Sequence, residues 1–205
     1  MSYEKPRESR TLFLASTSRY RRELLGRLHV PFEARAPQTD ESALPGELPE
    51  RMAARLAEAK ARSIADRDSI VIGSDQVASL GGRLLRKPGR HDVALAQLED
   101  CQGKTVIFHT AVFVLDTRSG RAWSHIDRTD VRFASRPRQE LDRYLTIEQP
   151  YDCAGSFKCE GLGVALFESI NARDPTALIG LPLIWLAAAL KDAGLDPLAP
   201  ARGGP

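Results

Sequence analysis

Apolar positions along the chain follow two different spacings. Runs of strand length cover residues 11–15, 69–73, 105–115, 122–133 and 163–168. Segments in which apolar residues recur with the period of a helix cover residues 20–28, 49–66, 90–100, 137–147 and 181–192. Because the two kinds of segment alternate, the pattern predicts an α/β fold in which helices flank a sheet.

Two neighbouring strands set the kind of sheet. The runs 105–115 and 122–133 are separated by a short polar turn at 116–120, which favours an antiparallel pair within a mixed, twisted sheet. No linker or repeat divides the chain, so a single domain is predicted over 11–195. The charged segment 1–10 and the Pro-, Gly- and Ala-rich segment 196–205 are predicted to be disordered ends.

Composition narrows the classes of partner. The 205 residues include 29 Lys and Arg against 27 Asp and Glu, a net charge of +2, which argues against nucleic-acid binding by bulk charge. No apolar run is long enough for a membrane span, and the first residues lack the apolar core of a signal peptide. We therefore expect a cytoplasmic protein with no membrane contact.

Metal-ligating residues of the zinc type are not grouped. The three cysteines, Cys101, Cys153 and Cys159, show no C-x-x-C spacing, and the four histidines form no H-E-x-x-H pattern. We expect reduced cysteines that pack as small apolar side chains. Any metal site should therefore use oxygen ligands.

An anion site is indicated where the first strand meets the first helix. Ser16 and Ser18 supply hydroxyl groups there, Arg21 and Arg22 supply guanidinium groups, and a helix N-terminus leaves backbone N–H groups unpaired. A phosphorylated ligand would fit. The alternative is that Ser18 caps the helix and the arginines point into water.

A lysine lies on an apolar helix face. In the segment 49–66, Met52, Leu56, Lys60 and Ile64 are four residues apart and share one face. Lys60 must therefore pair with an acid, reach a ligand, or extend its ammonium past the apolar face to water.

Acidic residues follow two of the predicted strands. Asp75 comes where the buried run ending in Gly-Ser-Asp stops, and catalytic groups collect beyond the carboxyl ends of strands in α/β sheets. Asp40-Glu41 follows the strand-like segment 31–36, and Lys87 ends a hairpin-like run that begins near Leu84. Carboxylates with lysines suit a divalent cation and phosphates. Asp75 could instead simply cap a turn.

The familiar phosphate and nucleophile motifs are missing. The chain has no P-loop, no G-x-G-x-x-G turn and no G-x-S-x-G elbow. An ordinary NTPase, a dinucleotide-binding oxidoreductase and an α/β-hydrolase are therefore disfavoured.

A set of short motifs in a fixed order resembles one family. They are L-A-S-x-S-x-x-R at 14–21, Asp40-Glu41, A-x-x-K-A at 57–61, G-S-D-Q at 73–76, Lys87-Pro88, C-A-G-S-F-K-x-E-G at 153–161 and G-L-P-L at 180–183. Together they resemble the Maf-like nucleotide pyrophosphatases, which hydrolyse nucleoside triphosphates to a monophosphate and pyrophosphate. The resemblance covers nearly the whole chain and implies an active-site cleft between two lobes.

The resemblance also implies roles for single residues. Asp75 would accept the proton of the attacking water, and Glu41 and Asp75 would hold Mg²⁺ or Mn²⁺. The remaining phosphate-site residues would be Ser16, Arg21, Lys60 and Lys87, and the residues setting base specificity would be Tyr20, Gln76 and Glu160.

The substrate branch follows from the same motifs. Gly155-Ser-Phe-Lys-Cys-Glu-Gly161 with Gln76 is similar to the branch that acts on 7-methyl-GTP, whereas the dTTP/UTP branch usually has Gln where this chain has Glu160. A methylated guanine is cationic and can bind over the Tyr20 ring, and the Glu160 carboxylate can accept hydrogen bonds from guanine N–H groups. The alternatives are a broader or dTTP/UTP-type pyrophosphatase and a nucleotide-binding regulator without turnover. Whether the protein forms a homodimer is left open by the sequence.

Overall fold

The computed structural model describes residues 10–66 and 68–199. Within them, seven strands form one mixed sheet in the order β2-β1-β3-β5-β6-β7, with β4 paired to β3. The strands are β1 (Thr11–Ala15), β2 (Glu33–Arg35), β3 (Ser69–Leu80), β4 (Arg83–Leu85), β5 (Thr105–Asp116), β6 (Ala122–Phe133) and β7 (Phe167–Ala172). The β1–β2 and β1–β3 pairs are parallel, and the others are antiparallel. The predicted mixed α/β fold is confirmed.

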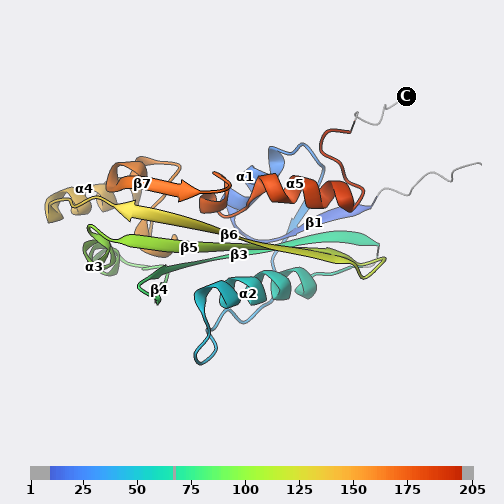
Figure 1. Cartoon of the computed structure of the whole chain (residues 1–205), viewed down its shortest axis with the longest axis horizontal. Coiled ribbons are helices and arrows are strands. Elements are labelled where there is room, and N and C mark those ends of the chain that lie inside the picture. Colours follow the sequence, from blue (N-terminus) through green and yellow to red (C-terminus); the bar gives the residue numbers. More distant parts are fainter. Residues whose placement is uncertain (1–9, 67, 200–205) are drawn as a thin grey trace, which may run out of the picture.

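Helices cover both faces of this sheet. They are α1 (Arg19–Gly26), α2 (Pro49–Ser63), α3 (His91–Cys101), α4 (Arg138–Glu148) and α5 (Leu183–Asp192), with short 3₁₀ turns η1 (Ala154–Ser156), η2 (Leu162–Leu166) and η3 (Ala177–Ile179). In Figure 1, α2 lies on one face, α1 and α5 lie on the other, and α3 and α4 gather at one end. None of the helices in the described part of the chain has the length and apolarity that a bilayer span needs.

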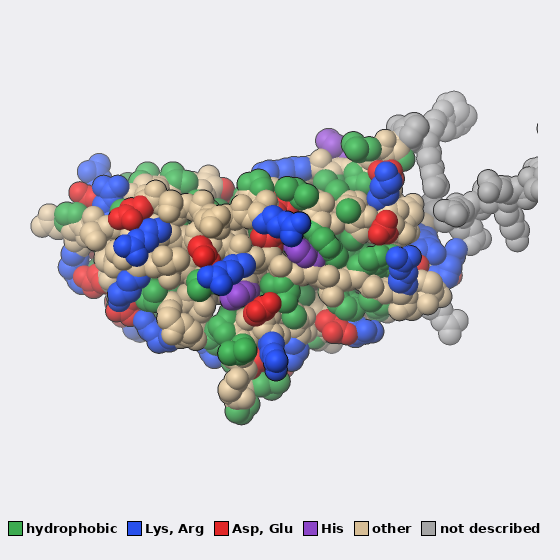
Figure 2. Space-filling model, viewed as in Figure 1, with side chains coloured by type: hydrophobic (Ala, Val, Ile, Leu, Met, Phe, Trp, Pro, Cys, Tyr) green, Lys and Arg blue, Asp and Glu red, His purple; other side chains and the backbone are tan. Residues whose placement is uncertain are grey.

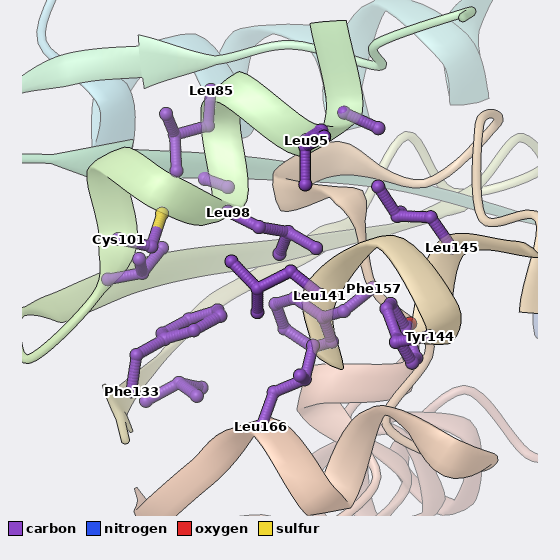
Figure 3. Packing of buried hydrophobic residues seen from close by; sticks show 14 of the residues in the cluster. Leu85, Leu95, Leu98, Cys101, Phe133, Leu141, Tyr144, Leu145, Phe157 and Leu166 are labelled. Carbon is purple, nitrogen blue, oxygen red and sulfur yellow. The ribbon is translucent and has the colours of Figure 1, made fainter. Parts of the chain in front are cut away.

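Three apolar clusters correspond to this arrangement. One joins α2 to the sheet, a second joins α1 and α5 to the opposite face, and a third joins α3, α4 and the 3₁₀ turns to the far end of β5 and β6. Figure 3 shows the third cluster, in which Leu98, Phe133 and Leu141 pack together. Side chains of β3 alternate between faces, so Ile70 and Ile72 enter one cluster while Val71 enters another. The central strand is therefore buried on both sides.

Surface charge is mixed, as the near-zero net charge suggests. On the face drawn in Figure 2, basic and acidic side chains are interspersed over the surface. Charged side chains pair in the described part of the chain, for example Arg132 with Glu168 at 3.2 Å and Arg128 with Asp130 at 2.7 Å. This face carries no extended basic stripe that would suit a nucleic-acid backbone.

One predicted strand is wrong. Residues 162–166 form η2, and the strand β7 begins only at Phe167. A Cβ at Gly163 would lie 2.2 Å from the carbonyl oxygen of Lys158, so the segment is folded tightly against the preceding loop. Leu166 is buried while Val164 is exposed. The apolar run therefore covers the end of the core, which periodicity alone cannot distinguish from a strand.

The predicted disordered ends fall mostly on residues outside the described part of the chain, namely 1–9 and 200–205. Of those that are described, Arg10 binds Asp116 at 2.8 Å, and Asp196 accepts a hydrogen bond from the Leu198 N–H at 3.0 Å. Both boundaries of the folded part therefore have specific polar contacts.

Helix α2 approaches β3 very closely at Gly73. A Cβ at this position would lie 2.1 Å from the Ala57 carbonyl oxygen and 2.6 Å from the Ala61 nitrogen, both backbone atoms. Only a residue without a side chain allows this contact. The separation of α2 from the sheet is therefore set at this point.

We predict that Gly73→Ala lowers the free energy of unfolding by about 3 kcal/mol or more, because backbone atoms must move apart. The measurement is denaturant unfolding followed by circular dichroism. Gly26→Ala is the matched control, since nothing lies within 4 Å of a Cβ there, and a change within about 0.5 kcal/mol is expected. Equal stability of the two variants would contradict the close packing.

Candidate active site

A cleft of about 820 Å³ lies between the two ends of the molecule. Its lining comes from the β1–α1 turn, residues 37–42, α2, β3, the segment after β4, residues 152–160 and η3. The nine residues to which the family resemblance gave roles all line this cleft: Ser16, Tyr20, Arg21, Glu41, Lys60, Asp75, Gln76, Lys87 and Glu160. The structure thus brings together residues that are far apart in the sequence.

Lys60 forms the centre of the cleft's polar floor. It is 6% exposed, and its Nζ lies 2.6 Å from Asp75 Oδ1 and 2.6 Å from Glu41 Oε1. Met52 and Leu56, which lie on the same face of α2, pack against the sheet. Lys60 is therefore also on the side of the helix that faces the sheet. Extension of this ammonium past the apolar face to water is therefore excluded.

The sequence predicted that Asp75 follows the end of a strand. In the structure it lies within β3. On one edge β3 pairs with β5 from Ile70 to Leu80. On the other edge β1 pairs only as far as Gly73 and β4 only from Ala78. The intervening residues therefore have no strand beside them on that edge within the described chain, and the cleft forms there.

Alternation along β3 separates the neighbours of Asp75. The carboxylate lies on the α2 side with Lys60, whereas Ser74 and Gln76 point to the opposite side, toward η3. The Gln76 Nε2 donates to Thr110 Oγ1, the Ala177 carbonyl and the Leu178 carbonyl at 2.9–3.1 Å. Gln76 lines the cleft, but its amide nitrogen is used in hydrogen bonds that join η3 to the sheet. The sequence pattern did not predict this structural role.

Electrostatics at the polar floor favour the ionised form of the Glu41 carboxylate. Burial alone would raise the pKa of Glu41, but the hydrogen bond from Lys60 and the charges of Lys60, Lys87 and Arg21 lower it below its usual range. Burial lowers the pKa of Arg21, and the charges of Asp75 and Glu41 oppose that effect. The attraction between opposite charges thus offsets part of the cost of removing these groups from water.

The β1–α1 turn contains both a serine that caps the helix and an arginine that lines the cleft. Ser18 is the N-cap of α1, and its Oγ accepts the Arg21 N–H at 3.4 Å, while Ser16 Oγ accepts the Ser18 N–H at 3.1 Å. Arg21 Nε donates to the Gly180 carbonyl at 2.9 Å. This bond orients the guanidinium in the cleft, whereas Arg22 is exposed. The alternative of a helix cap with solvated arginines therefore holds for Ser18 and Arg22 but not for Arg21.

The donor set bears on a divalent cation. Glu41 and Asp75 are oxygen ligands held close together by Lys60. The described residues contain no group of three or more His, Cys, Asp or Glu side chains placed to hold a metal. Mg²⁺ is commonly bound by one or two carboxylates together with substrate phosphates. The pair therefore fits a hard cation that also binds the substrate's oxygens.

The other end of the cleft contains Tyr20 and Glu160. The Arg19 guanidinium lies 4.8 Å from the centre of the Tyr20 ring, and the Cys159 thiol donates to Glu160 Oε2 at 3.3 Å. Burial raises the pKa of the Cys153 and Cys159 thiols to about 12. Both thiols therefore stay protonated at neutral pH and are not nucleophiles.

Some residues of the site lacked a sequence signal strong enough to single them out. Ser74 Oγ donates to the Ala111 and Gly180 carbonyls, and Lys158 Nζ donates to the Glu148 carbonyl at the end of α4. Both lie inside motifs quoted above, but their partners come from distant elements. Those partners position the η3 segment and the loop 152–160.

A family model described as "Maf-like protein" matches residues 11–193. The chain belongs to the Maf-like family. Maf-like relatives named "7-methyl-GTP pyrophosphatase" include one from Polaromonas sp., 54% identical, over 91% of this chain and 86% of the relative. Those from Xanthomonas campestris and Thiobacillus denitrificans are 54% and 51% identical, over 90% and 94% of this chain and 97% and 96% of each relative.

A solved structure has the same fold as this Maf-like chain. The HAM1 protein from Coxiella burnetii aligns with a TM-score of 0.50 and 13% identity, covering 90% of this chain and 100% of that chain. At this identity the likeness concerns the arrangement of strands and helices only.

We predict that Lys60→Met raises the pKa of Glu41, because the hydrogen bond and charge that lower it are removed. The pKa would be measured by carbon-13 NMR of the glutamate side chains. Lys191→Met, which removes a positive charge from the exposed side of α5, is the matched control and should leave Glu41 unchanged. An unchanged Glu41 in Lys60→Met would contradict the ion pair.

Proposed function

We propose that this chain is a 7-methyl-GTP pyrophosphatase, which hydrolyses 7-methyl-GTP to 7-methyl-GMP and pyrophosphate. The observation that carries the hydrolytic part is the buried Lys60 ammonium between the Asp75 and Glu41 carboxylates, at 2.6 Å from each, in a cleft of about 820 Å³. The choice of base is supported by the names of relatives with 51–54% identity.

The proposed reaction is attack of water on the α-phosphorus. Asp75 accepts a proton from the water, a new bond forms between the water oxygen and the α-phosphorus, and the bond to the bridging oxygen breaks. Pyrophosphate leaves with that oxygen. General-base catalysis of this kind contributes about 10²–10⁴-fold in rate.

The cations of the cleft would stabilise the charge on the phosphates. The hydrogen bond from Arg21 to the Gly180 carbonyl holds its guanidinium in place, so this cation needs little rearrangement when the transition state forms. Lys87 is exposed at the rim, where it can meet the triphosphate first. A pure binding protein would gain nothing from two carboxylates beside a triphosphate unless a cation lay between them.

A divalent cation, Mg²⁺ or Mn²⁺, is part of the proposal. Glu41 and Asp75 would hold it together with phosphate oxygens. When bound, it would polarise the phosphoryl oxygens and neutralise the leaving pyrophosphate. Lys60 now occupies both carboxylates, so its ammonium would turn toward the phosphates as the substrate enters.

The base would lie at the opposite end of the cleft. The Tyr20 ring offers a face to the cationic methylated guanine. Glu160 offers carboxylate oxygens to the guanine N1–H and amino groups, and the Cys159 thiol already orients one of those oxygens.

The substrate is tested by pyrophosphate release from 7-methyl-GTP, GTP, dTTP and UTP, each with Mg²⁺, with Mn²⁺ and with a chelator. We expect the highest kcat/KM for 7-methyl-GTP and loss of turnover in the chelator, since a cation neutralises the phosphates. A strong preference for UTP or dTTP would refute the role of Glu160, and binding without any release would favour a regulator.

Asp75→Asn tests the general base, since it keeps the shape and removes the proton acceptor. We expect kcat to fall by about 10²–10⁴-fold. Asp192→Asn, at the exposed end of α5, is the control and should retain wild-type turnover. Turnover near that of the wild type in Asp75→Asn would exclude this role.

A further inference from the structure

Both ends of the cleft contain acidic and basic side chains. At one end, Lys87 and Arg21 act on Glu41 together with Lys60. At the other end, the carboxylates of Asp152 and Glu160 line the wall beside Tyr20, together with Arg19 and with Lys158, whose Nζ donates to the Glu148 carbonyl. These two carboxylates and the ring suit a cationic group at this end.

Asp152 is an acid that makes no salt bridge within the described residues. Its described surroundings contain no ion-pair partner, and its Oδ1 accepts only a weak hydrogen bond from the Cys153 thiol at 3.5 Å. Asp152 and Tyr20 line the same cleft, and the Asp152 charge adds to the rise that burial produces in the pKa of the Tyr20 hydroxyl.

A cation already occupies the position beside Tyr20. The Arg19 guanidinium lies 4.8 Å from the ring centre, and its Nη2 donates to the Tyr20 hydroxyl at 3.3 Å. The pKa of Arg19 is raised mainly by Tyr20, with additions from the Glu23 and Asp152 charges. Since Arg19 has no salt bridge within the described residues, Tyr20 is its closest polar contact there.

We propose that Tyr20 and Asp152 form a cation subsite from which the methylated guanine displaces Arg19. This inference rests on the proposed function, which supplies a base with a positive charge. A cationic base replaces the guanidinium by an equivalent charge. A neutral guanine that replaced Arg19 would leave the Asp152 carboxylate and the ring face without a cation. Binding of GTP should therefore be weaker than binding of 7-methyl-GTP.

The experiment compares Asp152→Asn, Arg19→Gln and the control Asp192→Asn with the wild type. The readouts are the ratio of kcat/KM for 7-methyl-GTP to that for GTP, and the ratio of Kd values for 7-methyl-GMP and GMP. Because each ratio uses the same protein, general damage to folding or to the phosphate site cancels.

Opposite changes are expected for the two variants. Asp152→Asn should lower the selectivity for the methylated nucleotide about fivefold, whereas Arg19→Gln should raise it about threefold by removing the competing cation. Unchanged ratios in Asp152→Asn, or a fall in Arg19→Gln, would overturn the subsite. So would a changed Mg²⁺ dependence in Asp152→Asn with unchanged ratios, because that result would assign the carboxylate to a metal.

Failure of the proposed function would look different. In that case the wild type would release no pyrophosphate from 7-methyl-GTP, or would prefer another nucleotide. The Kd ratios for the two monophosphates would still test the subsite, since they need no turnover.

Discussion

The close approach of α2 to β3 at Gly73 is the constraint on which the site depends. With a Cβ there only 2.1 Å from the Ala57 carbonyl oxygen, the helix can lie directly on the strand. Lys60 then reaches Asp75, two residues further along the same strand, at 2.6 Å. A helix held further away would leave a buried ammonium and a buried carboxylate unpaired, which is strongly unfavourable.

The open edge of β3 is the second condition for a site. β1 stops at Ala15, opposite Gly73, and turns at once into α1. The first turn of α1 and residues 152–160 therefore both line the cleft at the unpaired stretch of β3 before β4. A sheet with complete pairing would have satisfied the same backbone groups and left no room for a ligand.

The two ends of the cleft suit different parts of the proposed substrate, with lysines and an arginine near Asp75 for the phosphates and carboxylates beside Tyr20 for the cationic base. The buried cations near Asp75 are compensated by carboxylates, so the phosphate end is ordered before a ligand binds. The Tyr20 end is more exposed and is arranged around Arg19, which a ligand can displace. Rigid binding of phosphates combined with exchange at the base end can select among nucleotides that share the triphosphate.

The sequence by itself determined the helices, most strands, the family and nine of the residues that line the cleft, because periodicity and motif spacing are local properties. Lys60 on an apolar helix face already required a partner, but its two carboxylates lie on other elements. Only the tertiary structure decided that Asp75 lies within β3, that Gln76 binds carbonyl groups of η3 and that Asp152 lines the same cleft as Tyr20. Such contacts join segments distant in the chain, and their geometry comes from packing, which local spacing does not encode.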